Sequence, residues 1–196
     1  MIMIMLENVL ARLSRLVNAK RDLRAGEWLF HRGDEVCSMF LVSSGTIELV
    51  RHSDEGKPAI LQRAAAGSLL AEASAFSARY HCDAIAADAS TVMEIPRRDF
   101  LALLENDRDF ARSWMAYLTS QVQAARLRSE ILTLKTVRQR LFAWLTFNDD
   151  KLPDKGNWRS LAFEIGVTPE ALYREIARRK ARPDEWTGTT PRHRGS

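Results

Sequence analysis

Residues 158–180 read WRSLAFEIGVTPEALYREIARRK, and this stretch predicts two short helices joined by a tight turn. Gly166 can adopt the positive φ that such a turn needs, and Ala162, four residues earlier, is small enough for close helix packing. Thr168 is a favourable N-cap, and Pro169 suits the first position of the second helix. The stretch therefore has the features of a helix-turn-helix.

The second of these helices has two different faces. Leu172 and Ile176 are four residues apart and would face the first helix, whereas Glu170, Arg174 and Arg178 share another face. A row of carboxylate and guanidinium groups is suited to reading base edges and holding phosphates in a major groove. The alternative is a helical hairpin within a core, with Glu170 and Arg174 forming a surface ion pair.

The placement of charge favours the first interpretation. The chain has 196 residues, enough for one large or two small domains, and its hydrophobic content of 46% is ordinary for a protein with a core. Residues 1–150 contain 19 Lys and Arg against 19 Asp and Glu, whereas residues 151–196 contain 10 against 6. This asymmetry is typical of a neutral domain attached to one that binds a polyanion.

Several classes of function find no support in the sequence. Cys37 and Cys82 are too few for a disulfide framework, and no Cys/His spacing indicates zinc. No P-loop, nucleophile elbow or metal constellation occurs, so we expect no enzyme, no catalytic residue and no metal ligand. The apolar start of six residues is too short for a signal peptide or a membrane span, so we expect a cytoplasmic protein without a membrane partner.

The first half of the chain has the sequence pattern of a β-domain. After a helical pattern at residues 6–17, short apolar runs in residues 23–95 are broken by glycines about ten residues apart. Residues 40–42 and 46–50 flank Ser-Ser-Gly and predict a hairpin, and residues 53–57 predict another turn. We therefore expect an all-β barrel or roll.

A long helix is predicted to follow, because residues 107–135 contain no Gly or Pro. Apolar and small residues recur there at alternating spacings of four and three, as in a coiled-coil seam. A second flank would pack on the chain's own domain; it consists of Phe110, Trp114, Tyr117 and Ile131. The seam predicts a C2 homodimer; its expected interface residues are Met115, Leu118, Val122, Ala125 and Leu132. A further helix is expected at residues 136–147.

This order of elements resembles the CRP/FNR family of bacterial transcription regulators. In the β-domain the resemblance rests on residues 23–30 (LRAGEWLF), 33–34, 40–45 (FLVSSG), Gly56, 67–68, Glu72, Phe76 and Ile95. It covers about residues 22–180 and implies an α+β fold with an N-terminal double-stranded β-helix. The implied domains are a sensor roll at 1–106, a dimerisation helix at 107–135, a helix-turn-helix DNA-binding domain at 136–182 and a basic disordered tail at 183–196.

The resemblance implies a homodimer that binds a palindromic operator in double-stranded DNA, with RNA polymerase as a partner. The expected DNA-binding residues are Thr168, Glu170, Arg174, Arg178, Arg179 and Lys180. In the family pattern Glu170 accepts from cytosine and Arg174 donates to guanine, whereas the three later cations meet phosphate. Family members continue into a β-hairpin wing, which we expect to be missing after Lys180. The alternative is a cyclic-nucleotide-binding regulatory module that acts on a protein partner, as in kinase regulatory subunits.

The resemblance also implies an effector pocket in the roll. Its expected residues are Gly67, Leu70, Ala71, Glu72, Cys82 and Asp83. Glu72 matches the family's ribose-binding Glu, but Ala71 stands where Gly is usual. Cys82 replaces the phosphate-gripping Arg and Asp83 the hydroxyl residue, with Arg79 as an alternative donor. Because a bidentate donor is lost and a carboxylate is gained, we expect no tight binding of cyclic nucleotide and no cofactor.

Other sensor chemistries of the family fit the two cysteines poorly. An iron–sulfur cluster of the usual type needs four cysteine ligands. His81 and Cys82 are adjacent, so on a strand they would point to opposite faces and could not easily share a haem iron. We expect Cys82 to be a small buried hydrophobe, with a redox-sensing thiol as the alternative, and Asp83 to face solvent or pair locally.

Overall fold

The computed structural model describes residues 9–52 and 58–181, which form two compact units divided between Ser120 and Gln121. The predicted turn at 53–57, the predicted tail at 183–196 and the place where a wing would follow lie outside the described residues. No described helix is both long enough and apolar enough to cross a membrane.

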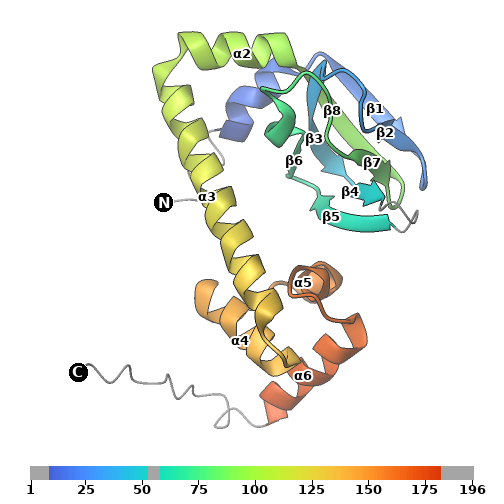
Figure 1. Ribbon diagram of the computed structural model, residues 1–196, viewed down its shortest axis with the longest axis vertical. Helices are drawn as coiled ribbons and strands as arrows, with labels where there is room; N and C mark the ends of the chain where they lie inside the picture. Colours follow the sequence, from blue (N-terminus) through green and yellow to red (C-terminus); the bar gives the residue numbers. More distant parts are fainter. Residues whose placement is uncertain (1–8, 53–57, 182–196) are drawn as a thin grey trace. The chain divides into compact units, whose positions relative to one another are not determined.

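The first unit is built around two antiparallel four-stranded sheets (Figure 1). One sheet has the order β1 (Ala19–Leu23), β8 (Ser90–Pro96), β3 (Ser38–Ser44) and β6 (Leu69–Leu70). The other has the order β2 (Trp28–Phe30), β7 (Asp83–Ala86), β4 (Thr46–His52) and β5 (Pro58–Ala65). The all-β roll predicted from the glycine spacing is therefore confirmed.

The hairpin predicted around Ser-Ser-Gly is wrong. The flanking strands β3 and β4 belong to different sheets: β3 pairs with β8 and β6, and β4 pairs with β5 and β7. Gly45 joins them with φ +78°, and a Cβ there would lie 2.3 Å from Ser90 Oγ and 2.5 Å from the Ala89 carbonyl oxygen. The glycine thus lets the chain pass from one sheet to the other against the start of β8.

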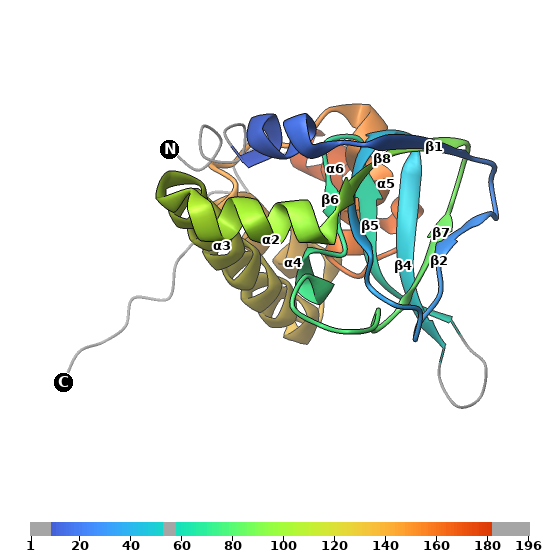
Figure 2. The ribbon, with the colours of Figure 1, turned by 90° about the horizontal axis from the view of Figure 1, so that it is seen from above.

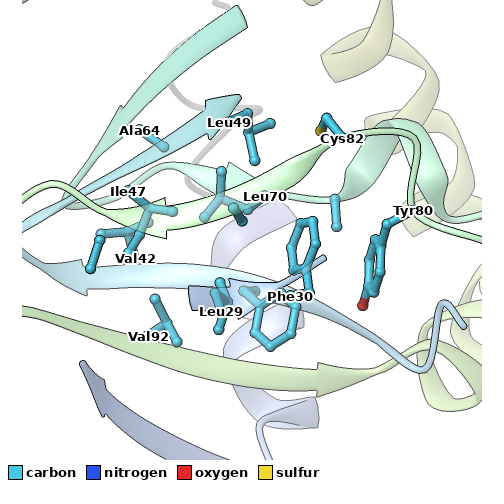
Figure 3. Packing of buried hydrophobic residues seen from close by; sticks show 14 of the residues in the cluster. Leu29, Phe30, Val42, Ile47, Leu49, Ala64, Leu70, Tyr80, Cys82 and Val92 are labelled. Carbon is cyan, nitrogen blue, oxygen red and sulfur yellow. The ribbon is translucent and has the colours of Figure 1, made fainter. Parts of the chain in front are cut away.

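Apolar side chains from both sheets meet between them and form the core of the roll (Figure 3). Phe30 of β2 stacks on Tyr80 with ring centroids 3.8 Å apart, and the Tyr80 hydroxyl donates to the Ser38 carbonyl oxygen at 2.7 Å. Burial raises the pKa of Tyr80 to about 12, so this hydroxyl remains a donor at neutral pH. The hydrogen bond satisfies a polar group that the core would otherwise disfavour.

Helices cover the outer face of the β1–β8–β3–β6 sheet (Figure 2). Residues 9–13 are helical and lead into η1 (Ser14–Leu16); α2 (Arg97–Asn106) follows β8 and leads into α3 (Arg108–Thr133). Asp107 caps α3, because its Oδ1 accepts from the backbone N–H of Phe110 at 2.9 Å, which lowers the pKa of Asp107. Phe110, Trp114 and Tyr117 are buried against this sheet, which confirms most of the second flank predicted for the long helix.

The second unit contains the C-terminal part of α3, α4 (Val137–Phe147), η3 (Lys155–Asn157), α5 (Trp158–Glu164) and α6 (Pro169–Ala181). Thr136 and Gln139 form a capping box that begins α4. Ile131, which was expected on the flank facing the roll, is buried here among apolar residues of α4, α5 and α6. The predicted helix-turn-helix and the α+β fold class are confirmed.

Candidate functional site

The turn between α5 and α6 is formed by the residues that predicted it. Gly166 has φ +66°, and the backbone N–H of Val167 donates to the Ala162 carbonyl at 2.9 Å, which ends α5. Thr168 Oγ1 accepts from the Ala171 N–H at 3.3 Å, and the Thr168 carbonyl accepts from the Leu172 N–H at 3.0 Å. Thr168 is therefore the N-cap of α6, as predicted.

The two faces predicted for α6 are also confirmed. Leu172 and Ile176 are buried against α4 and α5, with Leu161 and Ile165 among their neighbours. Three charged side chains on the other side are exposed: Glu170, Arg174 and Arg178. The first and second turns of α6 thus present a carboxylate and a guanidinium to solvent, the arrangement that can accept from and donate to base edges.

The three later cations on α6 have different surroundings. The Arg178 side chain is 68% exposed, with Nη1 3.4 Å from Glu175 Oε2. The Arg179 side chain is only 20% exposed, and its Nη2 donates to both carboxylate oxygens of Asp150, at 2.7 and 2.6 Å. Lys180 Nζ lies 5.6 Å from the centroid of the Trp158 ring. Asp150 is 29 positions from Arg179, so no local spacing in the sequence could have indicated this ion pair.

The predicted dimer seam on α3 is partly exposed. Met115, Val122 and Leu132 are 61%, 49% and 42% exposed, which is unusual for large apolar side chains. Ala125 is also exposed, whereas Leu118 is half-buried and packs against the helical core of the first unit. Four of the five predicted interface residues are therefore accessible in the single chain.

A cavity of about 110 Å³ lies in the roll next to η2 (Glu72–Ser74). Of the six predicted effector residues, Ala71, Glu72 and Cys82 line it. Gly67, Leu70 and Asp83 do not, and Leu70 is fully buried in the core of the roll. Ala71 has φ +65°, the left-handed conformation that explains why Gly is usual at this position in the family.

Asp83 lies outside the cavity, which corrects the expectation of a carboxylate near the phosphate position. Its Oδ1 accepts from the Arg32 N–H at 2.8 Å, and its two oxygens lie 3.6 and 3.4 Å from Nδ1 of His31 and His52. Cys82 faces the core, and successive residues along a strand point to opposite faces. Asp83 therefore pairs locally, as predicted, while Cys82 is buried.

The polar side chains that line the cavity are Gln62, Glu72, Ser74 and His81, together with the thiol of Cys82. Glu72 Oε2 is buried and accepts no hydrogen bond from a described residue, and burial raises the pKa of Glu72. Burial also raises the pKa of Cys82, so its thiol stays protonated at neutral pH. None of the described lining residues is Lys or Arg. Arg51, which sequence reasoning missed, donates instead to the His81 carbonyl at 3.2 Å, and Arg79 donates to the Gly33 carbonyl at 2.7 Å.

Comparisons with known proteins agree with this architecture. Residues 20–107 match the family model of the cyclic nucleotide-binding domain. The fumarate and nitrate reduction regulatory protein of Escherichia coli (strain K12) is 25% identical over 139 residues, which are 71% of this chain and 56% of the relative. The chain thus matches little more than half the length of this curated relative. The chain is therefore homologous to this regulator, and its first unit contains a region that matches the cyclic nucleotide-binding domain.

Solved structures of CRP/FNR type share the fold. A regulatory protein from Silicibacter pomeroyi DSS-3 is 27% identical with a TM-score of 0.60, covering 89% of this chain and 81% of that one. FixK2 from Bradyrhizobium japonicum is 18% identical with a TM-score of 0.65, covering 86% and 87%. The catabolite activator protein of Thermus thermophilus is 22% identical with a TM-score of 0.54, covering 90% and 84%. The predicted CRP/FNR fold is thereby confirmed.

Proposed function

We propose that the chain is a DNA-binding transcription regulator that acts as a homodimer on a palindromic operator. The observation that carries the proposal is the surface of α6, where Glu170, Arg174 and Arg178 are exposed on the side opposite the buried Leu172 and Ile176. A helix with this arrangement at the end of a helix-turn-helix is suited to the major groove. The named relatives are regulatory proteins, which supports the same class.

The exposed apolar surface of α3 supports the dimer. Exposed Met115, Val122 and Leu132 lie on the predicted seam, and a self-complementary seam is satisfied by a second copy related by a two-fold axis. Two recognition helices would then enter major grooves about 34 Å apart, one turn of B-DNA. We further propose residues 107–135 as the dimerisation segment, residues 136–182 as the DNA-binding domain, RNA polymerase as a partner and the cytoplasm as the location.

Residues 1–106 would then be the sensor. Two features argue against cyclic nucleotide as its signal: the cavity beside Glu72 is about 110 Å³, below the roughly 300–1,000 Å³ of ordinary ligand sites, and its described lining holds no Lys or Arg. A phosphate there would meet the buried Glu72 carboxylate without a balancing cation. The same features weigh against the alternative of a cyclic-nucleotide-controlled module acting on a protein partner.

The test is selection of bound fragments from random duplex DNA, with and without cell extract. We expect a palindromic sequence to be enriched, and dependence on extract would reveal a required effector. On the selected duplex, Arg174→Ala should weaken binding by about 1–3 kcal/mol and relax preference at one base position. Arg98→Ala removes the same charge from an exposed position on α2 and serves as the control, with unchanged binding.

Two outcomes would overturn the proposal. If the purified chain enriches no sequence and retains no DNA, the helix-turn-helix is not a recognition element. If cyclic AMP instead gives a clear micromolar calorimetric isotherm, the module acting on a protein partner becomes the better explanation.

A further inference from the structure

The guanidinium of Arg140, on α4, donates to four backbone carbonyl oxygens. Nε donates to the Leu134 carbonyl at 2.9 Å and Nη2 to the Leu132 carbonyl at 3.2 Å. Nη1 donates to the carbonyls of Gly166 at 2.7 Å and Ile165 at 3.2 Å. The Arg140 side chain therefore links the C-terminal end of α3 to the turn that precedes α6.

The acceptors explain why the position suits arginine. α3 ends at Thr133 and α5 at Glu164, so the Leu132 carbonyl belongs to the last turn of α3 and the other three acceptors lie just beyond the two helix ends. Carbonyls at a helix C-terminus have no partner within the helix and need another donor. The C-terminal end of a helix is also the negative end of its dipole, which favours a nearby cation. A guanidinium has five donors in a rigid planar fork, whereas a lysine ammonium is a compact charge that cannot span both helix ends in the same way.

Packing at Gly166 also brings together the C-terminal end of α3 and the turn between α5 and α6. A Cβ on Gly166 would lie 2.4 Å from Leu132 Cδ2 and 3.0 Å from Arg140 Nη1, so these groups occupy the space that the glycine leaves. Leu132 is also the last apolar residue of the predicted seam. The N-cap of α6, Thr168, follows Gly166 by two residues, so the start of the recognition helix is adjacent to this contact.

We infer that Arg140 is a positioning residue for DNA recognition, which fixes the start of α6 against the C-terminal end of α3. This inference rests on the proposed DNA-binding function. Any displacement of the end of α3 is then transmitted to Glu170 and Arg174 through the Arg140 hydrogen bonds and the Leu132–Gly166 contact. Arg140 itself need not touch DNA for this role.

The test compares Arg140→Lys, which keeps the charge, and Arg140→Gln with Arg138→Gln, an exposed position on the same helix. Full-length variants are titrated with the selected duplex and with a scrambled duplex of the same composition, and their thermal unfolding is recorded. For both Arg140 variants we expect the ratio of specific to scrambled affinity to fall about tenfold, the scale of one lost base contact. Binding to the scrambled duplex should stay within about twofold, because backbone contacts remain. Arg138→Gln should keep the ratio.

A purely structural role of Arg140 predicts a different pattern. The affinities for the selected and the scrambled duplex would then fall by the same factor, and the unfolding temperature would fall with them. That result, or an unchanged ratio in Arg140→Lys, would overturn the inference. Hydrogen exchange of the DNA-free protein provides a second measurement: Arg140→Lys should deprotect residues 165–172 while residues 141–147 of α4 keep their protection. If the wild type selects no duplex but this exchange pattern appears, the DNA-binding proposal fails and the coupling stands. Equal deprotection of residues 165–172 and of residues 141–147 would refute the coupling as well.

Discussion

Arg178 and Arg179 are neighbours on α6, yet their surroundings predict different contributions to DNA binding. The Arg178 side chain is 68% exposed, whereas the Arg179 side chain is 20% exposed and bound to the carboxylate of Asp150. A phosphate can recruit Arg178 with little rearrangement. To bind Arg179, the phosphate would have to displace Asp150, and that exchange only replaces one charged, hydrogen-bonded pair by another. We therefore expect Arg179 to remain with Asp150 in the complex.

The salt dependence of binding measures this difference. Each phosphate that a cation neutralises contributes about 0.9 to the slope of log Kobs against log salt concentration. Arg178→Ala should reduce the slope by about 0.9, whereas Arg179→Ala should leave it nearly unchanged. Asp150→Asn removes the competing charge and should steepen the slope by up to about 0.9. Because the Asp150 side chain is 70% exposed and screened by solvent, losing the Arg179 ion pair should cost at most about 1 kcal/mol of stability.

The assay is fluorescence anisotropy on the selected duplex between about 50 and 200 mM salt, with urea unfolding of each variant as the control for folding. Equal slope reductions for Arg178→Ala and Arg179→Ala would show that DNA takes Arg179 from Asp150. An unchanged slope in Asp150→Asn would show that Arg179 cannot reach phosphate even when it is released. Either result would refute the reasoning from the ion pair.

Three further results are expected. Met115→Glu combined with Val122→Glu should produce a monomer in sedimentation with unchanged circular dichroism, because both side chains are exposed in the single chain; a persistent dimer would place the interface elsewhere. Glu72→Gln should raise the unfolding temperature at pH 7 but not near pH 4. Burial raises the pKa of Glu72 above 4.5, so the protonated carboxyl leaves the folded wild type undisturbed below about pH 4.5, and stability is lost as the pH rises through the folded-state pKa. Equal unfolding temperatures of the wild type and Glu72→Gln at pH 7 would contradict this. Gly45→Ala should cost about 2–4 kcal/mol in urea unfolding, since φ is +78° and its Cβ would lie 2.3 Å from a side-chain oxygen of β8. Gly26→Ala, with φ +83° but nothing within 4 Å, should cost only about 1–2 kcal/mol, and equal losses would mean that the close contact relaxes.

The sequence predicted best those features whose partners lie within one or two helical turns. Gly166, Thr168 and Pro169 specify the turn and the start of α6 through the backbone conformations and the capping bond that each residue favours. The spacing of Leu172 and Ile176 identified the buried face in the same way, because residues four apart share a face in any α-helix.

Features set by distant partners could not be predicted. The strands at residues 38–44 and 46–52 have the spacing of a hairpin, but whether they pair depends on β8 and β7, which lie tens of residues further along the chain. The same holds for the Arg179–Asp150 ion pair and for the four carbonyls around Arg140, which come from two separate helix ends. Hydrophobic period and charge pattern carry no information about such partners.

The cavity in the roll shows how side-chain direction changes a conclusion drawn from aligned positions. Cys82 and Asp83 both depart from the family pattern, and the sequence suggested that together they oppose a phosphate. Only Cys82 lines the cavity, because Asp83 points outward to His31 and His52. What disfavours an anion is therefore the buried carboxyl of Glu72, whose Oε2 has no hydrogen-bond partner in the described part of the chain, with no Lys or Arg among the described lining residues. Arg51 donates to the carbonyl of His81, a residue that lines this cavity, so its guanidinium is already engaged by the backbone. When the Glu72 carboxyl is ionised, its buried oxygen needs a hydrogen-bond donor, and a ligand that donates hydrogen bonds supplies one where a phosphate oxygen cannot.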